Sequence, residues 1–213
     1  MPAPAALGFR LHTGWAALVA VSGVPGKFTV LLRRRIELLP ASNSLPRFVY
    51  HEAAELPPSQ AAELVHRVKA ASQEMARIAV KDTLDQLRSL GVAVKAAGIP
   101  SGSRLIPEDL AAVLRSHPLI HTAEAALFRQ AMASACEDRR LTIISVRERE
   151  VWLSAADAWE LKESELRKQV DGLRKSVGAP WGTDQKTAMA MALLALRGTN
   201  PHFGREVPGK KWA

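Results

Sequence analysis

Three strongly apolar segments stand close together at the start of the chain, and they constrain its fold more than any other feature of the sequence. Residues 7–12, 15–22 and 27–39 are rich in β-branched and long apolar side chains, which is typical of β-strands. The turns that separate them, at residues 13–14 and 23–26, are short and contain glycine. Strands joined by such short turns pair with one another, so the sequence predicts an antiparallel meander.

A long helical pattern follows the meander. Between Gln60 and Leu90 apolar residues recur at spacings of three and four, which places them on one face of a helix, and Gly91 is a typical residue for the end of that helix. The stripe consists of Leu64, Val68, Ala71, Met75 and Ile78. Further segments predict strands at residues 92–99 and 141–146, and helices at residues 107–115, 119–137, 154–177 and 184–196. Residues 48–51 are expected to pair briefly with the edge of the sheet.

The order of these elements, β-β-β-α-β-α-β-α, predicts the fold class. A meander followed by alternating strands and helices gives a mixed five-stranded sheet with helices on both faces, and hence an α/β protein. No linker composition interrupts the run, so we expect a single domain over residues 7–197. Residues 1–6 are expected to form a flexible tail, and residues 198–213 a basic C-terminal tail.

The charge of the chain indicates the kind of partner that it binds. Its 213 residues include 29 Lys and Arg against 21 Asp and Glu, a net charge of +8, which favours a polyanionic partner such as nucleic acid. The uncharged apolar stretch at residues 11–24 is too short and too interrupted to cross a membrane. The first ten residues lack the pattern of a secretory signal, and the single cysteine, Cys136, excludes an internal disulfide, so we expect a cytoplasmic protein.

Three segments of the chain resemble one known superfamily. The first is Leu-His-Thr-Gly-Trp at residues 11–15, followed by Val-Ala-Val-Ser at residues 19–22. The second is the strand at residues 92–98, followed by the helix that contains Glu124. The third is the alanine-rich helix at residues 183–190, which starts with an acid. Together with the order of the elements, these segments resemble the ribonuclease H-like superfamily, and within it the Holliday-junction resolvases and their pre-ribosomal-RNA-processing relatives.

The resemblance implies a three-layer ribonuclease H-like fold and metal-assisted cleavage of phosphodiester bonds. Members of the superfamily hold one or two Mg²⁺ ions between acidic residues on neighbouring elements, and the ions activate water and stabilise the leaving oxygen. This chain departs from the pattern. The first strand carries His12, or Arg10 if the turn is placed earlier, where an Asp is expected, and the strand at residues 92–99 ends without an acid. Only Asp184 stands where the family has a carboxylate.

One short segment, Ser-His-Pro-Leu-Ile-His-Thr-Ala-Glu, contains the most suggestive combination of side chains. His121 and Glu124 are three residues apart on a predicted helix and so share a face, and His117 lies one turn earlier. In the proposed fold this helix begins near the sheet edge where His12 and Asp184 are expected. We therefore predict one metal-binding cluster with the ligands His12, His117, His121, Glu124 and Asp184. In this cluster His121, Glu124 and Asp184 are the catalytic residues, and the cofactor is a divalent Mg, Mn or Zn ion, with imidazole favouring the borderline metals.

Each of these residues also has a structural explanation. His117 precedes a proline and fits a helix cap, and His121 fits a half-buried helix position. Glu124 and Asp184 are acids near the start of a helix, where the helix dipole favours them, and His12 fits an ordinary strand position. A further alternative makes His121 a general base that Glu124 orients.

Basic residues form a second set of candidates, for binding nucleic acid. Arg33 and Arg35 lie two residues apart on a predicted strand and so share a face, where guanidinium groups can hold phosphates. Arg104 and Lys186 add positive charge at a loop and at the start of the last helix. The alternative for the strand is that its charges protect an exposed sheet edge from aggregation.

Two hypotheses for the function follow from these observations. The first is a metal-assisted nuclease, or a related phosphoryl-transfer enzyme, that acts on nucleic acid with a histidine-containing active site. The second is a non-catalytic ribonuclease H-like module that binds nucleic acid or a protein partner, and it rests on the two missing acids. The apolar residues 151–153 are a candidate surface for self-association, which adds a homodimer to the expected assemblies.

Overall fold

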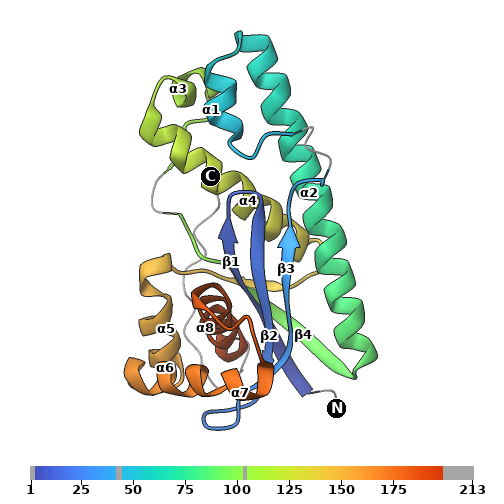
Figure 1. Cartoon of the computed structure of the whole chain (residues 1–213), viewed down its shortest axis with the longest axis vertical. Coiled ribbons are helices and arrows are strands. Elements are labelled where there is room, and N and C mark those ends of the chain that lie inside the picture. The colour runs from blue at the N-terminus through green and yellow to red at the C-terminus, as the bar shows by residue number, and fades with distance from the viewer. Residues whose placement is uncertain (1–2, 42–44, 103–104, 199–213) are drawn as a thin grey trace.

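The computed structural model describes residues 3–41, 45–102 and 105–198. A five-stranded sheet runs through the molecule in the order β3-β2-β1-β4-β5 (Figure 1). Its strands are β1 (Ala3–His12), β2 (Trp15–Ser22), β3 (Thr29–Glu37), β4 (Val92–Gly98) and β5 (Thr142–Ile144). The first three form the predicted antiparallel meander, and β4 and β5 continue the sheet in parallel with β1. The sheet is therefore mixed, with β1 at its centre.

Helices cover both faces of the sheet, which confirms the predicted fold class. α2 (Pro58–Ser89) and α4 (His117–Glu137) enclose one core with the sheet. The other core lies beneath α5 (Val151–Ala158), α6 (Glu163–Gly172) and α8 (Thr183–Gly198). Shorter elements are α1 (Val49–Ala54), α3 (Leu110–Leu114), the 3-10 helix η1 (Glu148–Glu150) and α7 (Arg174–Val177). Figure 1 shows α1 and α3 gathered at the start of α4, far from α6 and α7.

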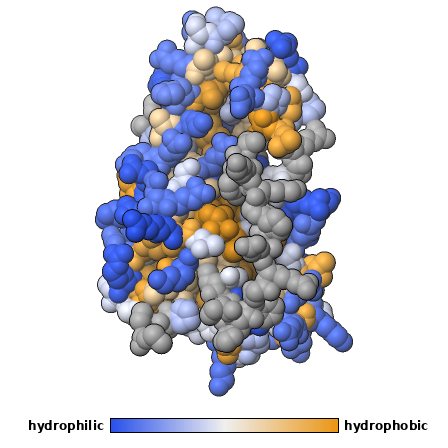
Figure 2. Space-filling model, turned by 180° about the vertical axis from the view of Figure 1, so that it is seen from behind, coloured by the Kyte–Doolittle hydropathy of each residue, from blue (hydrophilic) through white to orange (hydrophobic). Residues whose placement is uncertain are grey.

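α2 is the long amphipathic helix that the sequence predicts, but its buried face is turned by one residue. Ser72 and Ala76 are fully buried, whereas Met75 of the predicted stripe is half-buried and Ile78 is 48% exposed. The small residues let α2 lie close to α4 and the sheet, so packing decides against the larger side chains. The outer side of α2 is charged and forms the hydrophilic left edge of the space-filling view in Figure 2.

β1 shows how the sequence assigns side chains to the two faces of the sheet. Successive strand residues point to opposite faces. Leu7 and Phe9 are fully buried in the core beneath α2 and α4, whereas Gly8 faces α8. Arg10 and His12 lie on the same side as Gly8 by this alternation. Both polar side chains are therefore directed toward the layer that contains α8.

Two glycines allow α8 to approach the sheet closely. Gly8 of β1 and Gly98 of β4 are partners in the register of the sheet. A Cβ atom on Gly8 would lie 2.0 Å from the carbonyl oxygen of Ala188, and one on Gly98 would lie 2.2 Å from that of Met191. The backbone of α8 thus rests directly on the backbone of the sheet, which any larger residue would prevent. This contact fixes the position of α8 and hence of the residues in its first turn.

The segment predicted to pair with the sheet edge, residues 48–51, is instead the start of α1. The backbone N–H groups of Tyr50 and His51 donate to the carboxylate of Glu124 in α4, at 2.7 and 3.2 Å. Val49 is fully buried. The aromatic and β-branched residues of this segment favour a strand, but a carboxylate 73 or 74 residues away satisfies its N–H groups and a helix forms.

The N-terminal strand is longer than predicted. β1 begins at Ala3, so from there on the predicted tail of residues 1–6 belongs to the sheet. The reason is its partner, because β4 runs alongside in parallel and pairs Ala3 with Val92. The predicted tail at residues 198–213 falls outside the described residues apart from Gly198, which ends α8.

The apolar segment proposed for self-association is mostly covered. α5 begins at Val151, three residues before the predicted start, and this residue is fully buried. The guanidinium carbon of Arg167 lies 4.1 Å from the centre of the Trp152 ring, so that only Leu153 is largely exposed. A homodimer stays a prediction. None of the helices in the described ranges has the length and apolar character that a membrane span requires.

We predict that Gly98→Ala destabilises the protein, because the added Cβ would meet the backbone of α8. The free energy of unfolding, measured by urea denaturation followed by circular dichroism, should fall by at least about 2 kcal/mol. Gly172→Ala is the matched control, since no atom lies within 4 Å of an added Cβ at that position in α6. Its free energy of unfolding should stay within about 1 kcal/mol of the wild-type value. An equal loss in both variants would contradict the close packing of α8.

The single cysteine tests the packing of α4. Cys136 is fully buried, and burial raises the pKa of its thiol, which keeps it in the unreactive protonated form. We predict that an aromatic disulfide reagent leaves Cys136 intact in the folded protein and modifies it only as the protein unfolds in urea. Rapid modification in the absence of denaturant would show that α4 is not packed on the sheet as described.

Candidate functional site

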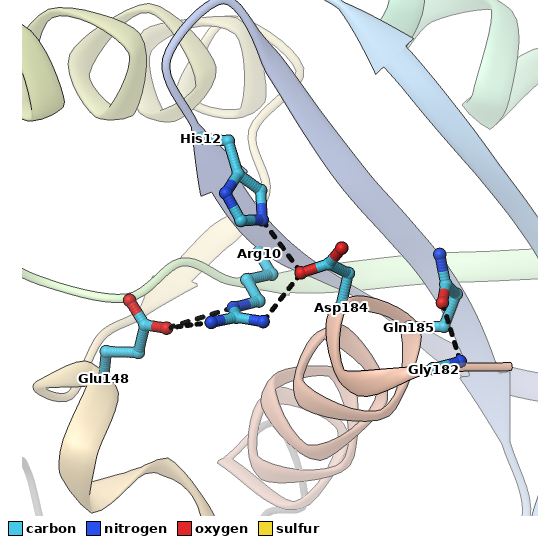
Figure 3. A network of polar contacts seen from close by, with 6 residues as sticks. All are labelled: Arg10, His12, Glu148, Gly182, Asp184 and Gln185. Atoms are coloured by element: carbon cyan, nitrogen blue, oxygen red, sulfur yellow. Dashed lines mark hydrogen bonds and ion pairs between the residues drawn. The ribbon is translucent and has the colours of Figure 1, made fainter.

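A network of charged side chains lies where the end of β1 meets the start of α8 (Figure 3). Asp184 is in the first turn of α8, and its Oδ1 accepts a hydrogen bond from Nη1 of Arg10 at 2.6 Å. The same oxygen lies 2.9 Å from Nε2 of His12. On its other side Arg10 donates from Nε to Glu148 of η1, at 3.0 Å. The guanidinium of Arg10 is therefore held between two carboxylates.

The sequence around each residue explains this geometry. Arg10 and His12 are two residues apart on β1 and share the face that α8 covers. Asp184 lies near the N-terminus of α8, where the helix dipole stabilises a negative charge. The side chain of Gln185 accepts a hydrogen bond from the N–H of Gly182 at 2.9 Å, which satisfies one of the free donors at the start of this helix. The contacts of Asp184 with Arg10 and His12 join this first turn of α8 to the end of β1.

The donor set of this network does not fit the magnesium ions that the resemblance implies. Mg²⁺ requires a shell of oxygen ligands in near-octahedral geometry. Here β1 contributes a guanidinium and an imidazole, and residues 97–100 at the end of β4 contribute no carboxylate. The Oδ1 of Asp184 is already engaged by both Arg10 and His12. Arg10 supplies the positive charge that compensates the acids in this place.

An aromatic stack continues the network along the sheet. The ring of His12 lies parallel to that of Trp15, with 4.2 Å between the ring centres. The guanidinium of Arg35 lies over the ring of Trp15, 3.8 Å from its centre, and also forms an ion pair with Glu37. This stack fixes the orientation of the His12 ring, and it engages Arg35, one of the predicted phosphate-binding residues.

Three histidines form a second cluster at the start of α4. His117 and His121 are four residues apart and share one face of α4, and His51 approaches them from α1. One ring nitrogen from each of the three lies within 4.8 Å of the others. The ring centres of His117 and His121 are 4.4 Å apart, and those of His51 and His121 are 4.7 Å apart. Imidazole nitrogens gathered in this way are a ligand set for a borderline transition metal.

Glu124 fixes the position of His51 within this cluster. The N-terminus of α1 has no capping side chain of its own, because its N-cap residue is Phe48. Instead Oε1 of Glu124 accepts from the N–H groups of Tyr50 and His51, which are the second and third residues of α1. The same oxygen lies 3.2 Å from Nδ1 of His51. Glu124 is buried, and its charge contributes to raising the pKa of Tyr50 after the larger effect of burial.

The predicted five-residue cluster is divided between these two places. His12 and Asp184 meet at the end of β1, whereas His117 and His121 meet at the start of α4. Glu124 lies near the second pair and contacts His51. The three-histidine group is the one set of three or more suitably close metal-binding side chains among the described residues. The physical reason for the division is that α4 and α8 cover opposite faces of the sheet.

Three residues of these clusters were not candidate site residues in the sequence analysis, and one of them, Arg10, was considered only as the residue that stands where an Asp is expected. His51 was assigned to a strand. The signal that could have identified it is the pair His117 and His121, four residues apart on one helix, because a metal bound by two histidines needs a further ligand from another part of the chain. Glu148 follows β5 and reaches the network through Arg10. An isolated acid in a run of alternating charges gives no signal of its own.

Most of the predicted phosphate-binding residues make contacts within the protein. Arg33 donates to the carbonyl oxygens of Val177, Ala179 and Pro180, so it holds the loop before α8 rather than presenting free donors. Lys186 forms an ion pair with Asp171 at 2.7 Å. Arg104 lies outside the described residues. These contacts are structural, so other arginines are the better candidates for binding phosphate.

A cleft of about 490 Å³ lies between the two clusters. Its lining includes His121 and Arg129 of α4, and Arg147, Glu148 and Arg149 from the segment after β5. Ser101 and Arg147 extend the pairing of β4 and β5 beyond the strand ends, which brings that segment to the carboxyl edge of the sheet. Burial lowers the pKa of Arg129, an effect that the charge of Glu148 opposes. The cleft thus joins three cationic side chains to one histidine of the second cluster.

Of three comparisons with known proteins, the one with solved structures found matches to this architecture. No family model and no curated protein sequence matches the chain. Among solved structures, T. thermophilus RuvC in complex with a Holliday junction substrate aligns with a TM-score of 0.51 at 15% identity, over 89% of this chain and 90% of that chain. Another structure of Thermus thermophilus RuvC aligns at 16% identity with a TM-score of 0.46, over 89% of this chain and 92% of that chain. The first likeness, together with the sheet order and the two helical layers, shows that this chain has the ribonuclease H-like fold.

Proposed function

We propose that the protein is a ribonuclease H-like module that binds nucleic acid and does not use the carboxylate-bound magnesium ions implied by the family resemblance. The position of Arg10 carries this proposal, because its guanidinium lies between Asp184 and Glu148 at the end of β1. The net charge of +8 supports a polyanionic partner. The RuvC structure that shares this fold is a complex with a Holliday junction substrate, which supports nucleic acid as that partner.

The Arg10 side chain opposes metal binding in two ways. A cation would have to compete for the Asp184 oxygen that Arg10 and His12 engage. It would also lie close to a guanidinium, which carries its charge at any physiological pH and repels a second cation. A water molecule at this place would then lack the metal that makes it a nucleophile.

The arginine-lined cleft is the surface on which we expect phosphates to bind. Arg147 and Arg149 both pair with Glu150, but 52% and 75% of their side chains are accessible, so they can turn toward a bound strand. Arg129 lies deeper, and no described residue forms a hydrogen bond or ion pair with its guanidinium. A guanidinium group can donate two parallel hydrogen bonds to the oxygens of one phosphate, so this arrangement suits a nucleic-acid backbone.

A second candidate function is the metal-assisted nuclease, and one observation favours it. The ligand nitrogens of His51, His117 and His121 lie within 4.8 Å of one another beside the cleft. In that case Mn²⁺ or Zn²⁺ suits the site better than Mg²⁺ because the ligands are imidazoles. His121 would act as a ligand, with Glu124 acting through His51, and Asp184 would have no direct part in the chemistry.

We predict that the protein binds a DNA four-way junction and duplex DNA with an affinity that falls steeply as the KCl concentration rises. Arg147→Ala combined with Arg149→Ala should lower the slope of log affinity against log salt by about 2, because two phosphate contacts are lost. Fluorescence anisotropy over a range of KCl concentrations measures both quantities. The matched control is Arg174→Ala combined with Lys175→Ala, which removes the same charge from α7, where no residue lines the cleft. Equal losses in the two double variants would contradict binding at the cleft.

We further predict that about 10 mM Mg²⁺ leaves the midpoint of thermal unfolding unchanged, since a cation that does not bind the native state does not stabilise it. The same concentration should give no cleavage of a four-way junction, duplex DNA or single-stranded RNA. Differential scanning calorimetry and gel assays measure the two outcomes. Cleavage in Mg²⁺ that is lost in Asp184→Asn would overturn the proposal. Cleavage in Mn²⁺ or Zn²⁺ that is lost in His121→Ala would establish the second candidate instead.

A further inference from the structure

We infer that His51, His117 and His121 form a binding site for one divalent transition metal, with Zn²⁺ the best match. Neutral imidazole is a good ligand for zinc, and three histidines are a known set for zinc sites that keep one position open. The site lies at the junction of α1 and α4, on the face of the sheet opposite α8, and shares no residue with the Arg10 network. This inference does not depend on the proposed binding of nucleic acid.

The geometry of the three rings suits a metal. Zinc–nitrogen bonds of about 2.0–2.1 Å in a tetrahedral arrangement place the ligand nitrogens about 3.4 Å apart. The nitrogens of His51, His117 and His121 lie within 4.8 Å of one another, so rotations of the side chains bring them to that separation. His117 and His121 are exposed, so that an ion can enter and the rings can turn.

Glu124 provides an independent indication of a metal. Its Oε1 lies 3.2 Å from Nδ1 of His51, so that Nδ1 carries the proton and Nε2 is left free as a ligand. A carboxylate that accepts from the far nitrogen of a histidine is the usual support of a metal-binding imidazole. The side chain of Glu124 is 5% exposed, and its Oε2 is buried with no hydrogen-bond partner among the described residues. A buried charge of this kind is costly unless positive charge lies nearby.

Capping of α1 explains only part of this arrangement. It accounts for the two backbone N–H groups that donate to Glu124. It does not account for His117 and His121, which take no part in the cap and yet turn their rings toward His51. One shared cation accounts for the three rings and for the buried carboxylate together.

The cleft indicates what completes the coordination. Three protein ligands leave a fourth position for water or an anion. His121 belongs to the histidine cluster and also lines the cleft, where Arg129 and Arg147 supply positive charge. A phosphate oxygen in the cleft is therefore the anion that the surroundings favour.

We predict that the untagged protein, stripped with a chelator and dialysed, binds one equivalent of Zn²⁺ in isothermal titration calorimetry. Co²⁺ in its place should give the visible absorption of a four- or five-coordinate site. His121→Ala should weaken zinc binding by more than about 100-fold, which exceeds the effect of losing a supporting residue. His66→Ala removes an exposed histidine of α2 as the matched control, and His12→Ala removes one from the Arg10 network. Both should bind zinc as the wild type does.

Several results would overturn the inference. Absence of stoichiometric zinc binding by the folded wild-type protein would do so directly. A loss in His12→Ala as large as that in His121→Ala would place the metal at the end of β1. A loss in His66→Ala of that size would indicate adsorption to surface histidines. Circular dichroism of each metal-free variant distinguishes loss of a ligand from loss of the fold, and His117→Ala serves as a second ligand variant if His121→Ala does not fold.

We also predict that Glu124→Gln weakens zinc binding by about 10-fold, because the amide keeps the shape and one acceptor oxygen but removes the charge that supports His51. The titration is made under conditions where the far-ultraviolet circular dichroism of the metal-free variant matches that of the wild type. The absorption bands of bound Co²⁺ should shift as well, which a purely structural cap would not cause. Unchanged zinc affinity and an unchanged Co²⁺ spectrum would show that Glu124 only caps α1.

Discussion

The contact of α8 with the glycines of β1 and β4 is the constraint on which the rest of the structure depends. Because Gly8 and Gly98 are register partners without side chains, a helix of alanines and methionines lies against the centre of the sheet at backbone distance. This arrangement brings the first turn of α8 to the end of β1. The pairing of Asp184 with Arg10 and His12 is a consequence of this contact, since β1 directs every second side chain to the same side.

The same contact defines how this chain departs from the expectation raised by its fold. In an open α/β sheet the carboxyl edge of the parallel strands is the usual place for ligands. Here that edge carries the Arg10 ion pairs, and the acids present, Asp184 and Glu148, are joined through one guanidinium. The chain thus keeps the architecture of the fold, while a guanidinium lies between the two acids at this edge of the sheet.

Periodicity in the sequence was sufficient for the sheet and the long helix, since these depend on local pattern and on the order of the elements. The expectation that His12 and Asp184 lie at one edge of the sheet came instead from the fold that the resemblance implies. Periodicity could not predict α1, because the side chain that stabilises this helix, Glu124, lies more than seventy residues away. Nor could it predict that His121 and Asp184 lie apart. Which face each helix covers is decided by packing against the sheet, and the apolar stripes of α4 and α8 are compatible with either face.

The dependence of α1 on Glu124 links folding to ligand binding. A helix of six residues does not form alone in water, and a cap contributes only about 1 kcal/mol. The burial of Val49 and Ala53 and the carboxylate of Glu124 hold α1 against α4, and His51 lies in the last turn of α1. A metal shared by His51 and the two histidines of α4 would tie the two helices together, so part of its binding energy would be spent on ordering α1. Metal binding at the cluster would therefore be thermodynamically coupled to the conformation of α1.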